Sequence, residues 1–401
     1  KEYLQYLKLF IMKKSLLFLL VLFLQVTFMK AQEYVHQILV LNEGYFDYTT
    51  QQIIEPVTIG SYDPISQVYT EVATIDGARF ASDIIINDGY FYVAADNKIL
   101  KYDLNNYILL EETIVPGARN LAISGDNLFI TRGEYMITFD SYLQVYNKND
   151  LSFITEYDTI TGPKWATQDM IIDNNILYVA INNGFQWGNE KGRIGVVDLN
   201  NLSYISEIDL GANGINPDNM MIDGGIIYTV NNKDWSGMSI SQFDITTTTT
   251  TTTNMTSVST GCGTSCLRGG KVHYQTSGDT ELYEWDGTYA IPIGMSNSFY
   301  ELAVDNINNL LYASSTDWAS YGEIFIYDQN NILVGSFLCG VSPGNITFDL
   351  RTTTGIHSVF SDSYDHSSTQ VYDILGRVIS DDRFMKEGVY IKDNKQFYIA
   401  K

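Results

Sequence analysis

A short sequence phrase recurs along most of the chain, and this repeat limits the folds that the chain can adopt. Each copy contains a short strand, an Asn/Asp/Gly turn, a strand of the Leu-Tyr-Val type, a variable loop, and a strand that ends in an aromatic-Asp pair. The clearest copies lie at 83–106, 169–201 and 219–245, and weaker ones lie at 37–64, 120–150, 271–287 and 301–331. Helical periodicity is almost absent outside the N-terminal region, so we expect an all-β protein.

The second strand of every copy carries a large apolar residue at the same place, with an average spacing of about 46 residues. These residues are Leu39, Tyr92, Phe129, Tyr178, Tyr228, Tyr274 and Tyr312. Seven copies of this size, made of short strands joined by turns, are typical of the blades of a β-propeller. The first copy lacks its leading strand, and SPGNITFDLR (342–351) matches the leading strands of the others. We therefore predict a seven-bladed β-propeller over 33–351, closed by this segment beside the first blade, which removes an exposed edge.

The N-terminal region is typical of an export signal. A basic region at Met12 to Lys14 precedes the apolar run SLLFLLVLFLQV (15–26), which is too short to span a bilayer comfortably. We interpret residues 1–31 as an upstream extension and a signal peptide, with Met12 as the natural start and cleavage before Gln32. No other segment is apolar enough for a transmembrane helix. The mature protein is therefore expected to be secreted or held at the cell surface.

The charge of the chain limits the partners that it can bind, and its cysteine content bears on disulfide formation. The chain has 47 Asp and Glu against 24 Lys and Arg, a formal net charge of −23 that repels phosphate backbones. Nucleic acid is therefore not an expected partner. In an oxidising compartment Cys262 and Cys266 could close a small disulfide loop, and Cys339 is expected to be a buried small apolar residue.

Two further patterns are interpreted as structural. A carboxylate or amide side chain follows the third strand of every copy, where it can accept a hydrogen bond from the turn backbone. These residues are Asp63, Asp103, Asn147, Asp198, Asp244, Asp286 and Asp328. A run of Thr residues from Thr246 to Thr253 falls where the outer strand of the fifth blade belongs, and β-branched residues suit such an edge. The alternative for this run is a glycosylated or adhesive patch.

The phrases ILVLNEG (38–44), SYDP (61–64), LYVAINN (177–183) and GRIGVVDLNN (192–201) resemble the YVTN/YncE-like propeller family. The NEG start is similar to that of its surface-layer-like members, and the likeness covers roughly 36–351. This resemblance implies the propeller fold. It also implies that capture of a corrinoid for an outer-membrane transporter is conceivable, because some similar surface propellers do this. No residue of this chain singles out that ligand.

The segment QVYDILGRVISDDRFMKEGVYIKDNKQFYIAK (370–401) resembles the C-terminal sorting domain of the type IX (Por) secretion system. The matching parts are YD at 372–373, LGR at 375–377, GVY at 388–390 and the terminal Lys401. We assign 356–401 to this small β sorting tail and expect three short strands. The resemblance implies the type IX machinery as a partner and a location outside the outer membrane of a Gram-negative cell.

The sequence contains no strong catalytic pattern. The HExxH, GxSxG, Walker-type and EF-hand motifs are all missing, and we expect neither a cofactor nor a metal. The chain has only four His residues, which does not favour a His-rich metal centre. Asp83, Asp169 and Asp218 open three inner strands and could form a ring of carboxylates at the channel mouth. The interpretation that we favour is that they hydrogen-bond the backbone of neighbouring blades.

Aromatic and basic residues gather in the loops that share one predicted face of the propeller. The loops between the second and third strands lie at the same end as the loops that lead into each blade, and four of the five Trp residues fall there. Aromatic surfaces with scattered cations suit a sugar, a planar molecule or a peptide. The candidate ligand-binding residues are Arg79, Phe80, Arg119, Arg132, Tyr135, Lys164, Trp165, Phe185, Trp187, Trp235, Trp318 and Tyr321. The alternative is that these aromatic residues only seal the loops.

Three functions remain open at this point. The leading hypothesis is a non-catalytic surface propeller that binds a small ligand, a glycan or a protein partner. The second is a structural or adhesive scaffold at the cell surface. The third is a metal-dependent hydrolase or lactonase that uses the central channel, which would require the inner-strand carboxylates to converge on a metal ion.

Overall fold

The computed structural model describes residues 32–352 and four strand segments near the C-terminus, 371–373, 378–379, 388–392 and 395–399. The predicted signal peptide at 1–31 lies outside the described residues. One compact unit spans Tyr34–Arg351, and a second contains the C-terminal strands. Within the described ranges, no helix is long and apolar enough to cross a membrane.

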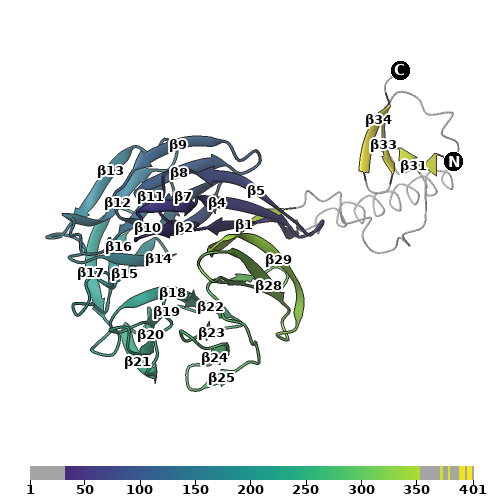
Figure 1. Ribbon diagram of the computed structural model, residues 1–401. Helices are drawn as coiled ribbons and strands as arrows, with labels where there is room; N and C mark the ends of the chain where they lie inside the picture. The colour runs from purple at the N-terminus through teal and green to yellow at the C-terminus, as the bar shows by residue number, and fades with distance from the viewer. Residues whose placement is uncertain (1–31, 353–370, 374–377, 380–387, 393–394, 400–401) are drawn as a thin grey trace, which may run out of the picture. The chain divides into compact units, whose positions relative to one another are not determined.

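Seven four-stranded antiparallel sheets form the blades of a closed ring (Figure 1). From blade 1 to blade 7 the inner strands are β30 (Pro343–Thr352), β6 (Asp83–Asn87), β10 (Ala118–Ser124), β14 (Thr167–Asp173), β18 (Pro217–Asp223), β22 (Ser265–Arg268) and β26 (Leu302–Asp305). The second strands are β1 (Glu33–Asn42), β7 (Tyr90–Ala95), β11 (Asn127–Arg132), β15 (Ile176–Ile181), β19 (Ile226–Asn231), β23 (Lys271–Tyr274) and β27 (Leu310–Ser315).

The third and outer strands complete each blade. The third strands are β4 (Val57–Asp63), β8 (Lys98–Asp103), β12 (Ser141–Asn147), β16 (Arg193–Asp198), β20 (Met238–Asp244), β24 (Tyr283–Trp285) and β28 (Tyr321–Tyr327). The outer strands are β5 (Val68–Ile75), β9 (Leu109–Ile114), β13 (Phe153–Asp158), β17 (Ser203–Asp209), β21 (Thr249–Thr256), β25 (Ala290–Pro292) and β29 (Leu333–Val341). A short hairpin, β2 (Tyr45–Asp47) and β3 (Gln52–Glu55), is inserted between β1 and β4 of blade 1.

The predicted seven-bladed propeller is confirmed, and the second strands explain why the repeat was visible. Each of the seven marker residues lies on the second strand of a different blade. Both faces of such a strand are covered by neighbouring blades, so most consecutive residues are apolar. On β7, Phe91 packs in the cluster between blades 1 and 2, and Tyr92 packs in the cluster between blades 2 and 3. The core of residues 32–352 therefore consists of apolar clusters between successive blades.

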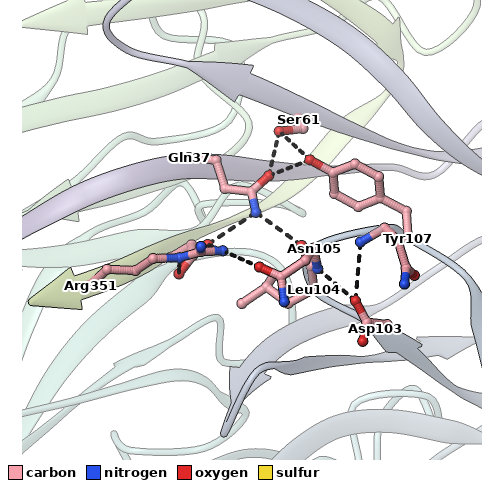
Figure 2. A network of polar contacts seen from close by, with 9 residues as sticks. Gln37, Ser61, Asp103, Leu104, Asn105, Tyr107 and Arg351 are labelled. Atoms are coloured by element: carbon pink, nitrogen blue, oxygen red, sulfur yellow. Dashed lines mark hydrogen bonds and ion pairs between the residues drawn. The ribbon is translucent and has the colours of Figure 1, made fainter. Parts of the chain in front are cut away.

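Blade 1 closes the ring, as predicted, because its inner strand comes from the C-terminal end of the propeller and its other strands from the N-terminal end. Figure 2 shows the polar network at this junction. Gln37 on β1 is buried, and its Nε2 donates to the carbonyl oxygen of Leu104 at 3.1 Å and to Asp349 on β30 at 3.0 Å. Its Oε1 accepts hydrogen bonds from the hydroxyls of Ser61 and Tyr107. One side chain thus joins both ends of the propeller to blade 2.

The turn after the third strand has the predicted cap in every blade. The carboxylate or amide oxygen of each capping residue accepts a hydrogen bond from the backbone N–H two residues later. Figure 2 includes one of them, Asp103, which also accepts a backbone hydrogen bond from Tyr107. These seven capping residues are therefore structural.

The Thr-rich run and the C-terminal strands also have defined places. The Thr run forms much of β21, the outer strand of blade 5, paired with β20. The C-terminal unit contains an antiparallel sheet of β31 (Val371–Asp373), β32 (Val378–Ile379), β33 (Gly388–Lys392) and β34 (Lys395–Ile399), in the order β32-β31-β33-β34. Four strands are present where three were expected, because residues 388–392 and 395–399 form a hairpin of their own.

Candidate functional site

A cavity of about 860 Å³ lies at the end of the central channel, where the loops that lead into the blades meet the loops between second and third strands. All seven blades contribute to its wall, and the β2–β3 hairpin adds Tyr45, Phe46 and Tyr48. Because the inner strands repeat with one register, each blade places at least two consecutive residues at the wall, in equivalent positions.

We name these positions the first ring, nearer the loops, and the second ring, one residue deeper. From blade 1 to blade 7 the first ring is Gly344, Ser82, Arg119, Gln168, Asp218, Thr264 and Tyr300. The second ring is Asn345, Asp83, Asn120, Asp169, Asn219, Ser265 and Glu301. The rings are polar because this backbone faces the open channel and not a neighbouring blade.

Several second-ring side chains join neighbouring blades. Asp83 of blade 2 accepts from the backbone N–H of Leu121 in blade 3 at 2.7 Å and from the Asn345 amide of blade 1 at 3.1 Å. Asp169 of blade 4 accepts from the backbone N–H of Met220 in blade 5 at 2.6 Å. These two carboxylates therefore have the inter-blade role that we favoured for them. Asp218, the third residue of that prediction, lies in the first ring, and its one hydrogen bond among the described residues comes from Asn232 of its own blade, at 3.3 Å.

Two glutamates of the wall, in blades 1 and 7, have side-chain partners in place of backbone N–H groups. The Tyr300 hydroxyl donates to Glu43 at 2.6 Å, and a Cβ on Gly344 would occupy the place of the Glu43 carboxylate. Glu301 is only 8% exposed, and its Oε2 has no hydrogen-bond partner among the described residues. A buried carboxylate oxygen without a donor is costly, which makes Glu301 a functional candidate.

Burial changes the protonation of all five cavity carboxyl groups. Desolvation raises the pKa of Glu301 to about 8, of Glu43, Asp83 and Asp169 to about 7, and of Asp218 to about 6. Hydrogen bonds oppose this effect only in part, as with the Leu121 amide on Asp83 and the Tyr300 hydroxyl on Glu43. The wall can therefore take up or release protons near neutral pH.

Half of the predicted binding residues line the cavity. These are Arg79, Phe80, Arg119, Phe185, Trp235 and Trp318. The Arg79 guanidinium is engaged by Asp96 at 2.6 Å and by Glu134 at 3.1 Å. Arg119 stacks on Phe185, with its guanidinium carbon 4.7 Å from the ring centre, and forms no ion pair among residues 32–352.

The two cavity tryptophans have unusual backbone conformations. Trp235 and Trp318 have φ values of 66° and 69°, in the left-handed region that large side chains rarely adopt. Each follows an aspartate that caps the turn, Asp234 through Ser236 and Asp317 through Ser320. Such strain persists where the surrounding structure holds it and is frequent at ligand sites.

The other half of the predicted residues lie outside the cavity wall. Arg132 is buried at the end of β11, where it donates to the carbonyl oxygens of Pro116 and Ser141, so it is structural. Trp187 is 70% exposed and contacts Tyr135 edge to face. Trp165 lies beneath Lys164 and two other cations, Lys191 and Arg193. Tyr321, at the start of β28, is exposed.

Sequence reasoning did not identify Glu43, Tyr300 or Glu301 as site residues. Glu43 was visible within the NEG phrase, and Glu301 stands where Asp83 stands in its own blade, so aligning the inner strands would have found it. The disulfide that Cys262 and Cys266 could form is not present in the structure. The two thiols are free in the structure, because Cys262 lines the cavity while Cys266 is packed between blades 6 and 7.

The cavity offers little for metal or nucleophilic chemistry. Among the described residues, no group of three or more His, Cys, Asp or Glu side chains is arranged to hold a metal ion. No His belongs to the described lining. Desolvation raises the pKa of the Cys262 thiol, which disfavours the reactive thiolate.

Comparisons with known proteins identify the architecture. No family model matches the chain, and no curated protein sequence matches it. Similar solved structures include a quinonprotein alcohol dehydrogenase-like protein from Bacteroides thetaiotaomicron, with 13% identity, coverage of 79% of each chain and a TM-score of 0.56. A candidate 6-phosphogluconolactonase from Bacteroides fragilis has 12% identity, coverage of 78% of this chain and 98% of the other, and a TM-score of 0.56. A hypothetical selenium-binding protein from Sulfolobus tokodaii has 12% identity, coverage of 84% and 97%, and a TM-score of 0.56. At such identities these likenesses identify the fold alone, a β-propeller.

Proposed function

We propose that this protein is a non-catalytic binding protein whose propeller holds a small polar organic ligand in the cavity at the end of its channel. The observation that carries the proposal is the wall itself, a cavity of about 860 Å³ with aromatic residues at its mouth and polar rings below. A concave site with apolar walls and a few converging polar groups is the usual form of a small-molecule site.

The chemistry of the lining favours binding over catalysis. The described wall lacks His, its one thiol has a raised pKa, and its best-placed carboxylates, Asp83 and Asp169, hold neighbouring blades together. The hydrolase alternative would need a metal site, and the described residues contain no suitable cluster. The scaffold alternative remains the main competitor, and the experiment below separates it from ligand binding.

We also propose that the protein acts outside the cell, at the surface of a Gram-negative bacterium. The basic and apolar N-terminal region and the likeness of 370–401 to a type IX sorting tail support this location. The acidic surface, with a net charge of −23, is compatible with a soluble ligand and disfavours anionic lipid.

The binding proposal can be tested by thermal shift with a panel of polar aromatic compounds and sugars. Compounds that bind the folded state are expected to raise the unfolding temperature in a concentration-dependent way. The variant Trp235→Asn/Trp318→Asn should lose this shift, because both tryptophans line the cavity mouth. Asn tolerates the left-handed backbone at both positions, so the unliganded variant should keep its stability.

Trp187→Ala is the matched control, since Trp187 is exposed on the same face but does not line the cavity. It should retain the ligand-induced shift. If no compound stabilises the protein through the cavity residues, the scaffold alternative gains and the binding proposal is wrong.

A further inference from the structure

The charge on the cavity wall is unbalanced. Five carboxyl groups line it, contributed by blades 1, 2, 4, 5 and 7, against the guanidinium groups of Arg79 and Arg119. Arg79 is already neutralised by Asp96 and Glu134, outside the described lining. One guanidinium therefore faces five acidic groups, and once these groups are ionised the field inside the cavity favours positive charge.

One oxygen of these carboxyl groups lacks a donor in the part of the chain that the structure describes, although the Thr264 hydroxyl hydrogen-bonds the same carboxyl group. Among the described residues Glu301 Oε2 has no hydrogen-bond partner, although the residue is more than nine-tenths buried and belongs to the cavity wall. Asp83 and Asp169, which influence Glu301 electrostatically, direct their oxygens to backbone N–H groups of the next blade. The Oε2 atom of Glu301 is thus a second-ring carboxylate oxygen whose hydrogen-bonding capacity is left for a molecule in the cavity.

The mouth of the cavity suits a cation with a flat apolar part. Trp235 and Trp318 line it on blades 5 and 7, and Trp318 contacts Tyr300 edge to face with ring centres 4.4 Å apart. Phe80 and Phe185 stand on the far side, where they already stack with Arg119. Aromatic faces attract cations, and the attraction grows when water is excluded.

The spacing of the acidic groups favours an organic cation over a metal ion. A metal ion needs three or more ligands around one point, and no such group exists among the described residues. The five carboxyl groups are instead distributed around the ring, one from each of five blades. An ammonium group bonds one or two of them through N–H donors, with a hydrocarbon or aromatic part on the tryptophans.

We propose that the cavity binds a small organic ammonium compound, whose N–H groups donate to Glu301 and the neighbouring acids and whose apolar part lies against Trp235 and Trp318. This inference rests on the proposed binding function and specifies the ligand class. Entry of the cation favours the ionised carboxylates, so binding releases protons and tightens as pH rises from 5 to 8.5. The titratable and charged groups that face Glu301 or the cavity are Glu43, Tyr45, Tyr48, Arg79, Asp83, Arg119, Asp169, Asp218, Cys262, Cys266 and Tyr300.

The test uses three probes of one shape and different charge, phenethylamine, 2-phenylethanol and 3-phenylpropionate, titrated calorimetrically into the full chain. At pH 8.5 the amine should bind at least about tenfold more tightly than either of the others. Its affinity should fall as pH is lowered to 5. Titrations in two buffers of different ionisation enthalpy should reveal proton release on binding.

Two isosteric variants test whether the cavity carboxylates bind the amine. Glu301→Gln and Asp218→Asn should each weaken amine binding severalfold while leaving binding of 2-phenylethanol within about twofold, because each removes one negative charge with little change of shape. Glu156→Gln is the control, since Glu156 lies on the outer strand β13 away from the cavity lining. Equal loss in the control would overturn the proposal.

The outcomes separate this inference from the binding function. If 2-phenylethanol or 3-phenylpropionate binds through Trp235 and Trp318 as tightly as the amine, the cation class is wrong and the cavity remains a binding site. Preference for the propionate would identify Arg119 as the anchor of an anionic ligand. If the amine does not bind at millimolar concentration, the inference is overturned whatever the broader compound panel shows.

Discussion

The Glu301 carboxyl group connects the cavity to the stability of the fold. Its pKa of about 8 in the folded protein lies well above the ordinary value of a glutamate, because burial disfavours the charged form. Between those two values the folded state binds more protons than the unfolded state, so the free energy of unfolding falls as pH rises through this window. A difference of one in pKa corresponds to about 1.4 kcal/mol.

Glu301→Gln should therefore be more stable than the parent protein at pH 8.5, by about 1 kcal/mol or more. At pH 4.5 the two should be nearly equal, because Gln resembles the protonated acid. Urea unfolding at both pH values measures the difference, with Glu156→Gln as the reference. Identical pH dependence in the variant and the parent would show that Glu301 does not titrate in this range.

Single residues of the site could be predicted from the sequence only where their type was unusual for their position. Trp235 and Trp318 stood out because large aromatics are rare in turns. Arg132 also stood out in the sequence. Its side chain, however, donates to the carbonyl oxygens of Pro116 and Ser141 and so lies away from the cavity, and the sequence does not reveal these bonds. Glu301 was not identified from the sequence because its place in the cavity wall follows only from the register of the seven inner strands.

At the scale of elements, the β2–β3 hairpin is the part of blade 1 that departs from the repeat. Its turn and its second strand are exposed, with Tyr48 66% and Ile54 48% accessible, so it contributes little to the core. Its first residues nevertheless form part of the cavity wall. The sequence indicated aromatic residues here but not a paired hairpin, because the strands are only three and four residues long.

Replacing residues 46–54 by a two-residue Asn-Gly turn should leave the unfolding temperature almost unchanged and weaken ligand binding severalfold. The reason is that the propeller sheets keep all their strands while one side of the cavity mouth is lost. Thermal unfolding with and without phenethylamine measures both effects. A large loss of stability in the unliganded variant would mean that the hairpin supports blade 1 and not the cavity alone.

At the scale of the whole molecule, the ring depends on the junction at Gln37. The side chain is 5% exposed and joins residues on β1, β4, β30 and the turn after β8. Gln37→Leu keeps the volume but leaves several buried polar groups without partners. We expect a loss of about 2–4 kcal/mol in the free energy of unfolding.

Urea unfolding checks this loss, with Gln144→Leu as the control, because Gln144 on β12 makes an exposed hydrogen bond to Glu156. A change in Gln37→Leu no larger than in the control would mean that backbone pairing of β30 closes the ring unaided.

The number of blades and the closing strand were predictable from the sequence, because each copy of the repeat corresponds to one blade of the ring. The polar junction was not, since its partners are distant in sequence.

The place of β30 has a consequence for how the protein is made. Gln37 and Asp349 are 312 positions apart, so this contact closes a loop that includes almost the entire propeller. Chain closure over such a distance is slow to form. A chain emerging from the ribosome or a translocation pore keeps β1 as an unpaired edge until its last propeller residues arrive. Throughout that interval one edge of blade 1 can pair with another chain, and it becomes protected only when β30 joins the sheet.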